Sequence, residues 1–175
     1  TAGWVIKDEN TKVLIDPYLS RIKLVGMSTS SKISKTAQNR DWGTDNRKKY
    51  YRDDVYEPDT SLINSMISNN TIDSSSYIFV HHTHFDHAAD VPFIAMKTGA
   101  RVIGTESLSN LLQAHGLPEK QIITVKGGED YDFENFSVKI IPSLHSALRD
   151  KQYFSSETIE KDIKVPLQIK DYVEG

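Results

Sequence analysis

The alternation of hydrophobic and polar positions predicts a hairpin, a helix and a buried strand in the first half of the chain. Two short β-rich runs, residues 4–6 and 13–15, flank a turn-rich stretch and predict a β-hairpin. Apolar residues at helical spacing predict a helix over residues 61–69. The apolar run at 75–80 follows it and predicts a buried strand.

Helices and strands alternate in the second half. The pattern predicts a helix from Ala88 to a stop at Gly99, a strand at 100–105, a helix at 106–116, a strand at 121–126, and a strand from Phe136 that runs into a loop at Pro142. Such alternation indicates an α/β fold, with helices layered on a sheet.

Residues 28–60 are polar and mixed in charge, which predicts a long loop or insertion. Within them the cluster RKKYYR, residues 47–52, interleaves basic and aromatic side chains and could bind a phosphate or polyanion. A solvated loop is the favoured interpretation. The tail from residue 155 is charged and has one short apolar run.

Composition limits the class of protein. The chain has 175 residues, 38% hydrophobic and 26% charged, which suits one globular domain. A formal charge of -3 gives no global field for nucleic acid or an anionic membrane, and no apolar run reaches the length of a membrane span. We expect a soluble protein, with the cytoplasm favoured although nothing fixes the compartment. Because cysteine is absent, any metal must be held by imidazole and carboxylate.

Four of the six histidines lie in seven residues: His81, His82, His84 and His87. In extended chain His82 and His84 point to the same side, so both can reach one ion, while Asp86 and His87 lie about a turn further on. The cluster follows a buried strand and precedes a helix, where α/β sheets bind ligands. Two neighbouring metal ions are conceivable. The alternative is that Asp86 only caps a helix and the histidines are exposed loop residues.

These residues carry a family resemblance. Residues 82–87, HTHFDH, read as H-x-H-x-D-H and resemble the metallo-β-lactamase fold superfamily. Asp16 in VLIDPYLS and His145 in IIPSLHS match that superfamily's early aspartate and next metal histidine, so the resemblance covers residues 3–147. The phrasing of these segments is most similar to the ascorbate-phosphate lactonase-like and phospholipase D-like zinc hydrolases.

The resemblance implies an αββα sandwich of two βα halves and one or two zinc ions, with manganese or iron as alternatives. It assigns His82, His84 and His145 to the first metal, and Asp86 and His87 to the second. Asp16 would support the loops through hydrogen bonds, and His81 has no ligand counterpart. Asp86 would also orient or deprotonate the attacking water, where it is not fully engaged as a ligand.

The sequence departs from the superfamily after His145. The bridging aspartate and final histidine of a two-metal site come from the second half, yet no histidine follows His145. Asp150, Asp162 and Asp171 lie in polar surroundings and are poor candidates. We therefore expect residues 1–175 to be the amino-terminal portion of the domain, with the second βα half missing and an insertion at about 28–60. An exposed sheet face would favour a homo-oligomer or a complementing chain.

The predicted function is zinc-dependent hydrolysis of an ester, lactone, amide or phosphodiester bond in a small-molecule substrate. Hydroxide generated on the metal would be the nucleophile, since zinc lowers the pKa of its bound water. The 175 residues alone are expected to be inactive or weakly active. One alternative is a non-catalytic metal-binding or interaction module. A second is a metal-dependent nuclease, which the charge balance disfavours, so no nucleic acid is expected as a partner.

Overall fold

The structure is a computed structural model that describes residues 3–25, 47–74, 76–145 and 157–175. The strands are β1 (Trp4–Lys7), β2 (Lys12–Ile15), β3 (Lys23–Leu24), β4 (Lys49–Tyr50), β5 (Ser76–Phe79), β6 (Arg101–Gly104), β7 (Ile122–Thr124), β8 (Asp130–Asp132) and β9 (Ser137–Lys139). The helices are α2 (Thr60–Ser68), α3 (Phe85–Ala88), α4 (Val91–Thr98) and α5 (Glu106–Ala114), with 3₁₀ turns η1 (Glu119–Gln121) and η2 (Ile169–Asp171).

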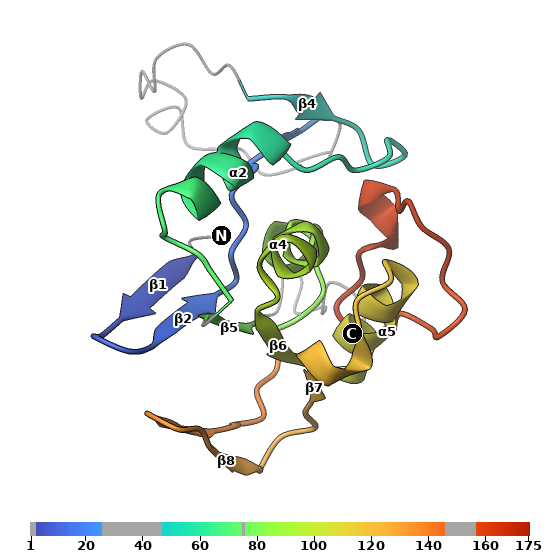
Figure 1. Cartoon of the computed structure of the whole chain (residues 1–175). Coiled ribbons are helices and arrows are strands. Elements are labelled where there is room, and N and C mark those ends of the chain that lie inside the picture. Colours follow the sequence, from blue (N-terminus) through green and yellow to red (C-terminus); the bar gives the residue numbers. More distant parts are fainter. Residues whose placement is uncertain (1–2, 26–46, 75, 146–156) are drawn as a thin grey trace, which may run out of the picture.

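Five strands form the main sheet, in the order β1-β2-β5-β6-β7 (Figure 1). β1 and β2 are antiparallel and form the predicted hairpin, while β2, β5, β6 and β7 are parallel neighbours. Helices lie in each connection between the parallel strands, because parallel pairing needs a crossover. The predicted α/β class is confirmed. The αββα sandwich and its missing half stay predictions.

The core lies between this sheet and the helices. Leu14, Ile78 and Val102 in the central strands are at most 1% exposed and pack with buried residues of α4 and α5. Figure 1 shows α2, α4 and α5 on this side of the sheet, with β8 on the other side. The edge strand β1 is exposed, and Trp4 keeps 66% of its surface accessible. The helices therefore cover the central strands on one face of the sheet, whereas the edge strand β1 stays exposed.

The predicted helix from Ala88 is two helices. The short helix α3 starts earlier, at Phe85, and α4 begins after Asp90. The predicted stop at Gly99 is confirmed, since Gly99 has a left-handed φ of 75° and its N–H bonds to the carbonyl of Ala95. The early start of α3 places Asp86 and His87 on a helical turn directly after the loop that holds the other histidines.

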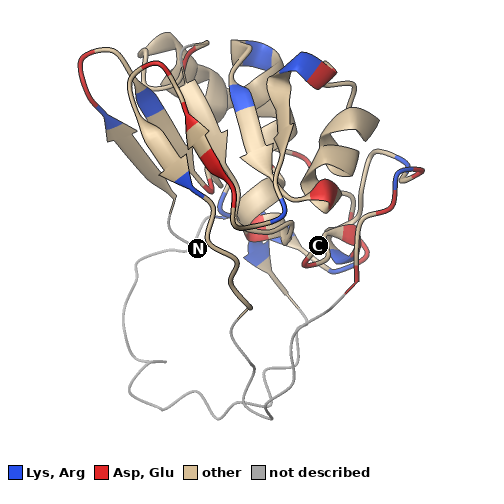
Figure 2. Ribbon diagram, turned by 90° about the horizontal axis from the view of Figure 1, so that it is seen from below, with Lys and Arg blue, Asp and Glu red and all other residues tan. Residues whose placement is uncertain are grey.

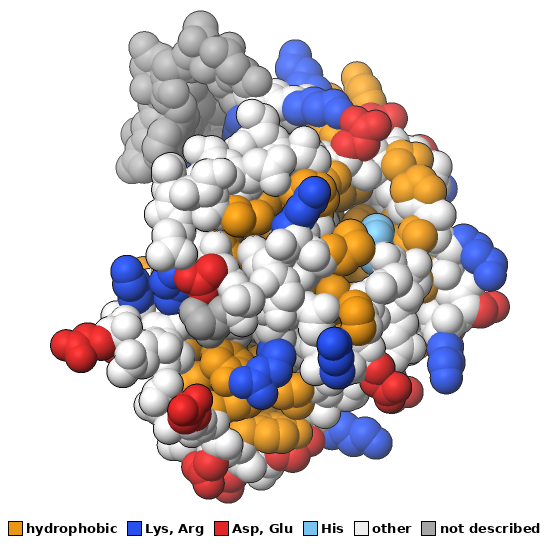
Figure 3. Space-filling model, viewed as in Figure 1, with side chains coloured by type: hydrophobic (Ala, Val, Ile, Leu, Met, Phe, Trp, Pro, Cys, Tyr) orange, Lys and Arg blue, Asp and Glu red, His pale blue; other side chains and the backbone are white. Residues whose placement is uncertain are grey.

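A second hairpin, formed by β8 and β9, leads the chain to His145. The sequence predicted the strand around β9 but not β8. Its aromatic residues Phe133 and Phe136 pack on Tyr77 of β5, with ring centroids 4.7 and 5.0 Å from it. Figure 3 shows this part of the surface as an apolar patch crossed by a basic side chain, and the guanidinium of Arg101 lies 4.5 Å from the Tyr77 ring centre.

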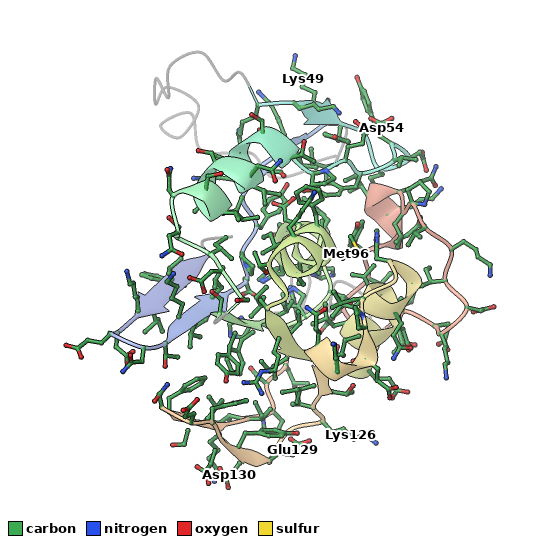
Figure 4. The ribbon with its side chains drawn as sticks, in the orientation of Figure 1. Lys49, Asp54, Met96, Lys126, Glu129 and Asp130 are labelled. Carbon is green, nitrogen blue, oxygen red and sulfur yellow. The ribbon has the colours of Figure 1, made fainter. Side chains whose placement is uncertain are left out.

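The turn into β8 is fixed by a carboxylate. Lys126, Glu129 and Asp130 lie together there (Figure 4), and Glu129 accepts the backbone N–H groups of Lys126 and Gly127, each at 2.7 Å. The tip of the hairpin, residues 134–136, lies beside Ser74 at the amino edge of the sheet. Because the tip lies at the amino edge, β9 runs back towards the carboxyl edge of the sheet and brings the chain to His145, which lies near His82 and His84.

The predicted polar insertion at 28–60 falls partly outside the described residues, which resume at 47. Its described part is not all loop, since β4 pairs with β3 in parallel and Tyr50 is 2% exposed. The basic cluster is also partly engaged, because Lys48 forms an ion pair with Glu57 at 2.7 Å. These contacts leave fewer basic side chains of residues 47–52 to bind a polyanion.

The carboxyl-terminal segment, residues 157–175, packs on the core although its sequence has no clear period. Its buried residues are Ile159, Leu167, Ile169 and Tyr172. Its backbone bonds to the segment before α2, where the N–H of Tyr56 reaches the carbonyl of Leu167 at 2.9 Å. In the sequence this segment showed only charge and one short apolar run, yet the structure makes it part of the fold.

None of the helices in the described ranges is both long and apolar enough to cross a lipid bilayer.

A buried carboxylate joins α4 to the chain that follows β2. Asp90 is 0% exposed, and its Oδ2 accepts the backbone N–H groups of Leu19 at 2.7 Å and Ser20 at 2.8 Å. Its Oδ1 accepts the hydroxyl of Ser20 at 2.7 Å and that of Tyr56. Burial and the Asp90 charge raise the pKa of Tyr56, so this hydroxyl remains a donor. These bonds compensate for the desolvation of Asp90.

We predict that Asp90→Asn destabilises the protein by about 3 kcal/mol, because an amide presents N–H groups to donors that now face a carboxylate. The measurement is the free energy of unfolding in urea. Asp162→Asn, at an exposed position, is the matched control and should change that free energy by less than about 0.5 kcal/mol. Equal stability of the two variants would contradict the role given to Asp90.

Candidate metal centre

The histidine loop lies between β5 and α3, at the carboxyl edge of the sheet. Figure 2 shows the parallel strands β2, β5, β6 and β7 side by side, with their carboxyl ends on the same side of the molecule as the carboxyl terminus. The N–H groups of His87 and Ala88 bond to the carbonyl of His84 at 2.9 and 3.0 Å. This turn folds the chain back, so His82, His84 and His87 lie within one small volume.

The structure brings together the three histidines that the resemblance assigns to the first metal. Ring nitrogens of His82, His84 and His145 all lie within 4.8 Å of one another. The Nε2 of His82 is 2.9 Å from the Nδ1 of His84. The ring centre of His145 is 4.9 Å from that of His82 and 5.1 Å from that of His84. Three nitrogens facing a common point are an arrangement that can hold a metal ion.

The protonation of this group suits a metal. The pKa of His82 is lowered to about 3 by burial and by the neighbouring histidines His87, His84 and His145. The pKa of His84 is lowered as well, by burial and then by His145. Both rings are therefore neutral at pH 7, and neutral imidazole is the form that binds zinc. A set of neutral nitrogens fits zinc, and manganese prefers more oxygen ligands.

Asp16 lies beside His81 and His87. Its Oδ2 is 2.6 Å from the Nδ1 of His81 and 2.8 Å from the Nδ1 of His87, and its Oδ1 accepts the His81 backbone N–H at 3.0 Å. These three side chains also lie close enough to form a ligand group. At these distances Asp16 accepts a hydrogen bond from the ring of His81 and lies in ion-pair contact with the ring of His87.

Asp16 is charged in this position. Burial raises its pKa, but the contacts with His87 and His81 outweigh burial and lower the pKa to about 2. Its backbone φ of 45° is in the left-handed region, which non-glycine residues adopt rarely. The carboxylate thus directs the Nδ1 of His87 away from the loop centre, so that Nε2 faces Asp86.

Asp86 and His87, predicted to contribute to a second metal, are less closely grouped. The Nε2 of His87 is 4.0 Å from the Oδ2 of Asp86. Among the described residues, neither group of three convergent ligands includes Asp86. Its side chain is 32% exposed, so water reaches it. The second metal site stays a prediction.

Two residues at the site had no role in the sequence-based prediction. His81, without a ligand counterpart, binds Asp16 through both its backbone N–H and its ring. Thr83 is 0% exposed, and its hydroxyl donates to the carbonyl of Val173 at 2.5 Å. For His81, the position next to the motif was a signal in the sequence. No sequence pattern pointed to Thr83, because its partner lies 90 residues away.

Comparison with known proteins finds relatives that are named as hydrolases. The chain is 38% identical over 104 residues to proteins named "UPF0173 metal-dependent hydrolase" from Staphylococcus aureus strains JH9, Newman and N315. The similarity covers 57% of this chain and 41% of each relative, so the chain spans less than half of their length. No family model matches the chain.

We predict that Asp16→Asn lowers the free energy of unfolding by about 2 kcal/mol, because an amide accepts fewer of the three N–H groups that face the carboxylate. Urea unfolding measures this change. The ¹⁵N shifts of the histidine rings should also move, at His81 and His87 and not at His115. Asp132→Asn, on the exposed side of β8, is the control and should leave both quantities unchanged. Unchanged ring shifts in Asp16→Asn would contradict the proposed contacts.

Proposed function

We propose that this chain is the metal-binding part of a zinc-dependent hydrolase. The observation that carries the proposal is the convergence of His82, His84 and His145 from two distant segments. The name of the relatives, metal-dependent hydrolase, points the same way. The bond cleaved would be an ester, lactone, amide or phosphodiester of a small molecule, in a hydrolase of the lactonase-like or phospholipase D-like type.

His82, His84 and His145 would hold the first ion, and Asp86 and His87 would contribute to a second. A bound zinc ion lowers the pKa of water and polarises the scissile bond. The chain's own contribution is to present neutral imidazoles, and burial supplies this by lowering the pKa values of His82 and His84. Neither His82 nor His84 then has to lose a proton before an ion binds.

Asp16 would act as a positioning residue. Its contact with the Nδ1 of His87 favours the tautomer that carries its proton on Nδ1, which places the lone pair of the ring on Nε2. The same oxygen accepts from the exposed ring of His81. The pair of contacts fixes the ring plane of His87 relative to the end of β2.

Asp86 would accept a proton from the attacking water. It is partly exposed and faces Nε2 of His87 across 4.0 Å, so it has the access that a general base requires. Its carboxylate lies at the amino end of α3, on the same turn as His87. Because only two ligands are proposed for the second ion, we expect weak or no turnover from these residues alone.

The test is the zinc content of the purified chain. We expect about one zinc per chain. His145→Ala should lose it, because one of three ligands is gone. His87→Ala should keep it. His115→Ala removes a histidine outside both ligand groups and should bind like the unmodified chain. Elemental analysis after gel filtration gives the ratio directly.

Two results would overturn the proposal. One is an unmodified chain that retains no zinc at concentrations where the control protein carbonic anhydrase does. The other is a His145→Ala variant that binds zinc as tightly as the unmodified chain. In the expected case, removing zinc with a chelator should also lower the unfolding temperature, since a ligand present at 100 times its Kd stabilises the folded state by about 2.7 kcal/mol.

A further inference from the structure

We propose that the carboxyl-terminal segment positions the metal ligands through Thr83, the residue between His82 and His84. The inference rests on the proposed metal site and goes further, since it assigns a site function to residues 157–175. Thr83 is a positioning residue, because it would touch neither metal nor substrate.

Thr83 faces away from the histidines on either side of it. Along an extended stretch, neighbouring side chains point to opposite sides. His82 and His84 point to their common centre, and Thr83 points into the protein, where it is 0% exposed. A change in the position of the Thr83 backbone would therefore move both ligands together.

Three hydrogen bonds fix that backbone to the carboxyl-terminal segment. The N–H of Thr83 donates to the carbonyl of Glu174 at 2.8 Å. Its hydroxyl is shared between the carbonyls of Val173 at 2.5 Å and Glu174 at 3.1 Å. Buried carbonyls need donors, so loss of the hydroxyl leaves the Val173 carbonyl without this partner.

The segment that supplies these carbonyls is itself anchored to α5. The N–H of Ile159 donates to the hydroxyl of Ser107 at 3.0 Å, and the side-chain amide of Asn110 donates to the carbonyl of Ile159 at 2.8 Å. The N–H of Gly175 bonds back to the carbonyl of Glu157 at 3.1 Å. The acceptors of Thr83 are thus held by a docked segment.

The packing at Thr83 is also tight. A Cβ added to Gly175 would lie 2.6 Å from the Thr83 Oγ1 and 2.5 Å from the Ser107 Cβ. Only a glycine backbone fits between these two side chains. The loop that bears His82 and His84 therefore rests directly on this segment, with no layer of side chains between them.

The matched pair Thr83→Val and Thr83→Ser tests the proposal. Valine keeps the volume and removes the hydroxyl, whereas serine keeps the hydroxyl. We expect Thr83→Val to bind zinc about 10- to 100-fold more weakly, as when an outer hydrogen-bond partner of a metal site is lost. Thr83→Ser should bind close to the unmodified chain. The affinity is measured by competition with a chromogenic chelator.

Ser109→Ala is the control for loss of a buried hydroxyl elsewhere. Ser109 is 5% exposed, and its hydroxyl lies 2.7 Å from the hydroxyl of Thr124 in β7. Ser109→Ala should lower the unfolding temperature without changing the zinc affinity. Equal zinc affinity in Thr83→Val and the unmodified chain would overturn the positioning role and leave the proposed metal site intact.

A second measurement needs no variant and decides the question if Thr83→Val does not fold. Coupling between sites is reciprocal, so zinc binding must stabilise the docked segment if the segment stabilises the site. We expect zinc to slow hydrogen exchange at the amides of Thr83 and Gly175, and not at Ile63 in α2. Slower exchange at residues 81–87 alone would refute the inference. No zinc binding by the unmodified chain would overturn the proposed function and this inference with it.

Discussion

The contact of Asp16 with the histidine loop is the interaction on which the site depends. Parallel pairing places Ile15 beside Phe79, so Asp16 leaves its strand next to the point where the loop begins. Its N–H bonds to the carbonyl of Phe79 at 2.9 Å, and its left-handed backbone turns the carboxylate towards His81 and His87. Such a backbone is unfavourable for aspartate, and three N–H groups on one carboxylate offset that cost.

A second carboxylate holds the same segment from the other side. Asp90 binds the backbone of Leu19 and Ser20, so the chain after β2 is fixed at both ends. Both carboxylates are buried and both are satisfied mainly by groups far away in the sequence. Charged groups are costly to bury unless their partners are in place. The two aspartates thus allow one arrangement of the loop and oppose others, which is what a preorganised set of ligands needs.

The sequence predicted the parts of the molecule that repeat or alternate locally. The hairpin of β1 and β2, the helix α5 and the stop at Gly99 follow from spacing and backbone preference, and the structure confirms them. The convergence of His145 with the loop was expected from resemblance. What could not be predicted depends on distant partners: Asp90 reaches back across 70 residues to Ser20, and the tail packs without a period. Hydrophobic periodicity reports burial along one element and carries no information about such contacts.

The three histidines proposed as metal ligands differ in how firmly the protein holds them. His82 and His84 rest on a loop tied to β2 and to the carboxyl-terminal segment, whereas His145 follows residues that are largely exposed, with Leu144 at 81%. Two of them thus lie on a well-supported loop, and the third lies on a stretch with little packing of its own. A metal ion bound by all three would join that stretch to the sheet edge, so part of its binding free energy would hold the chain before His145 in place. Affinity for the ion therefore depends on the stiffness of two separate supports, and the Thr83 contact acts on only one of them.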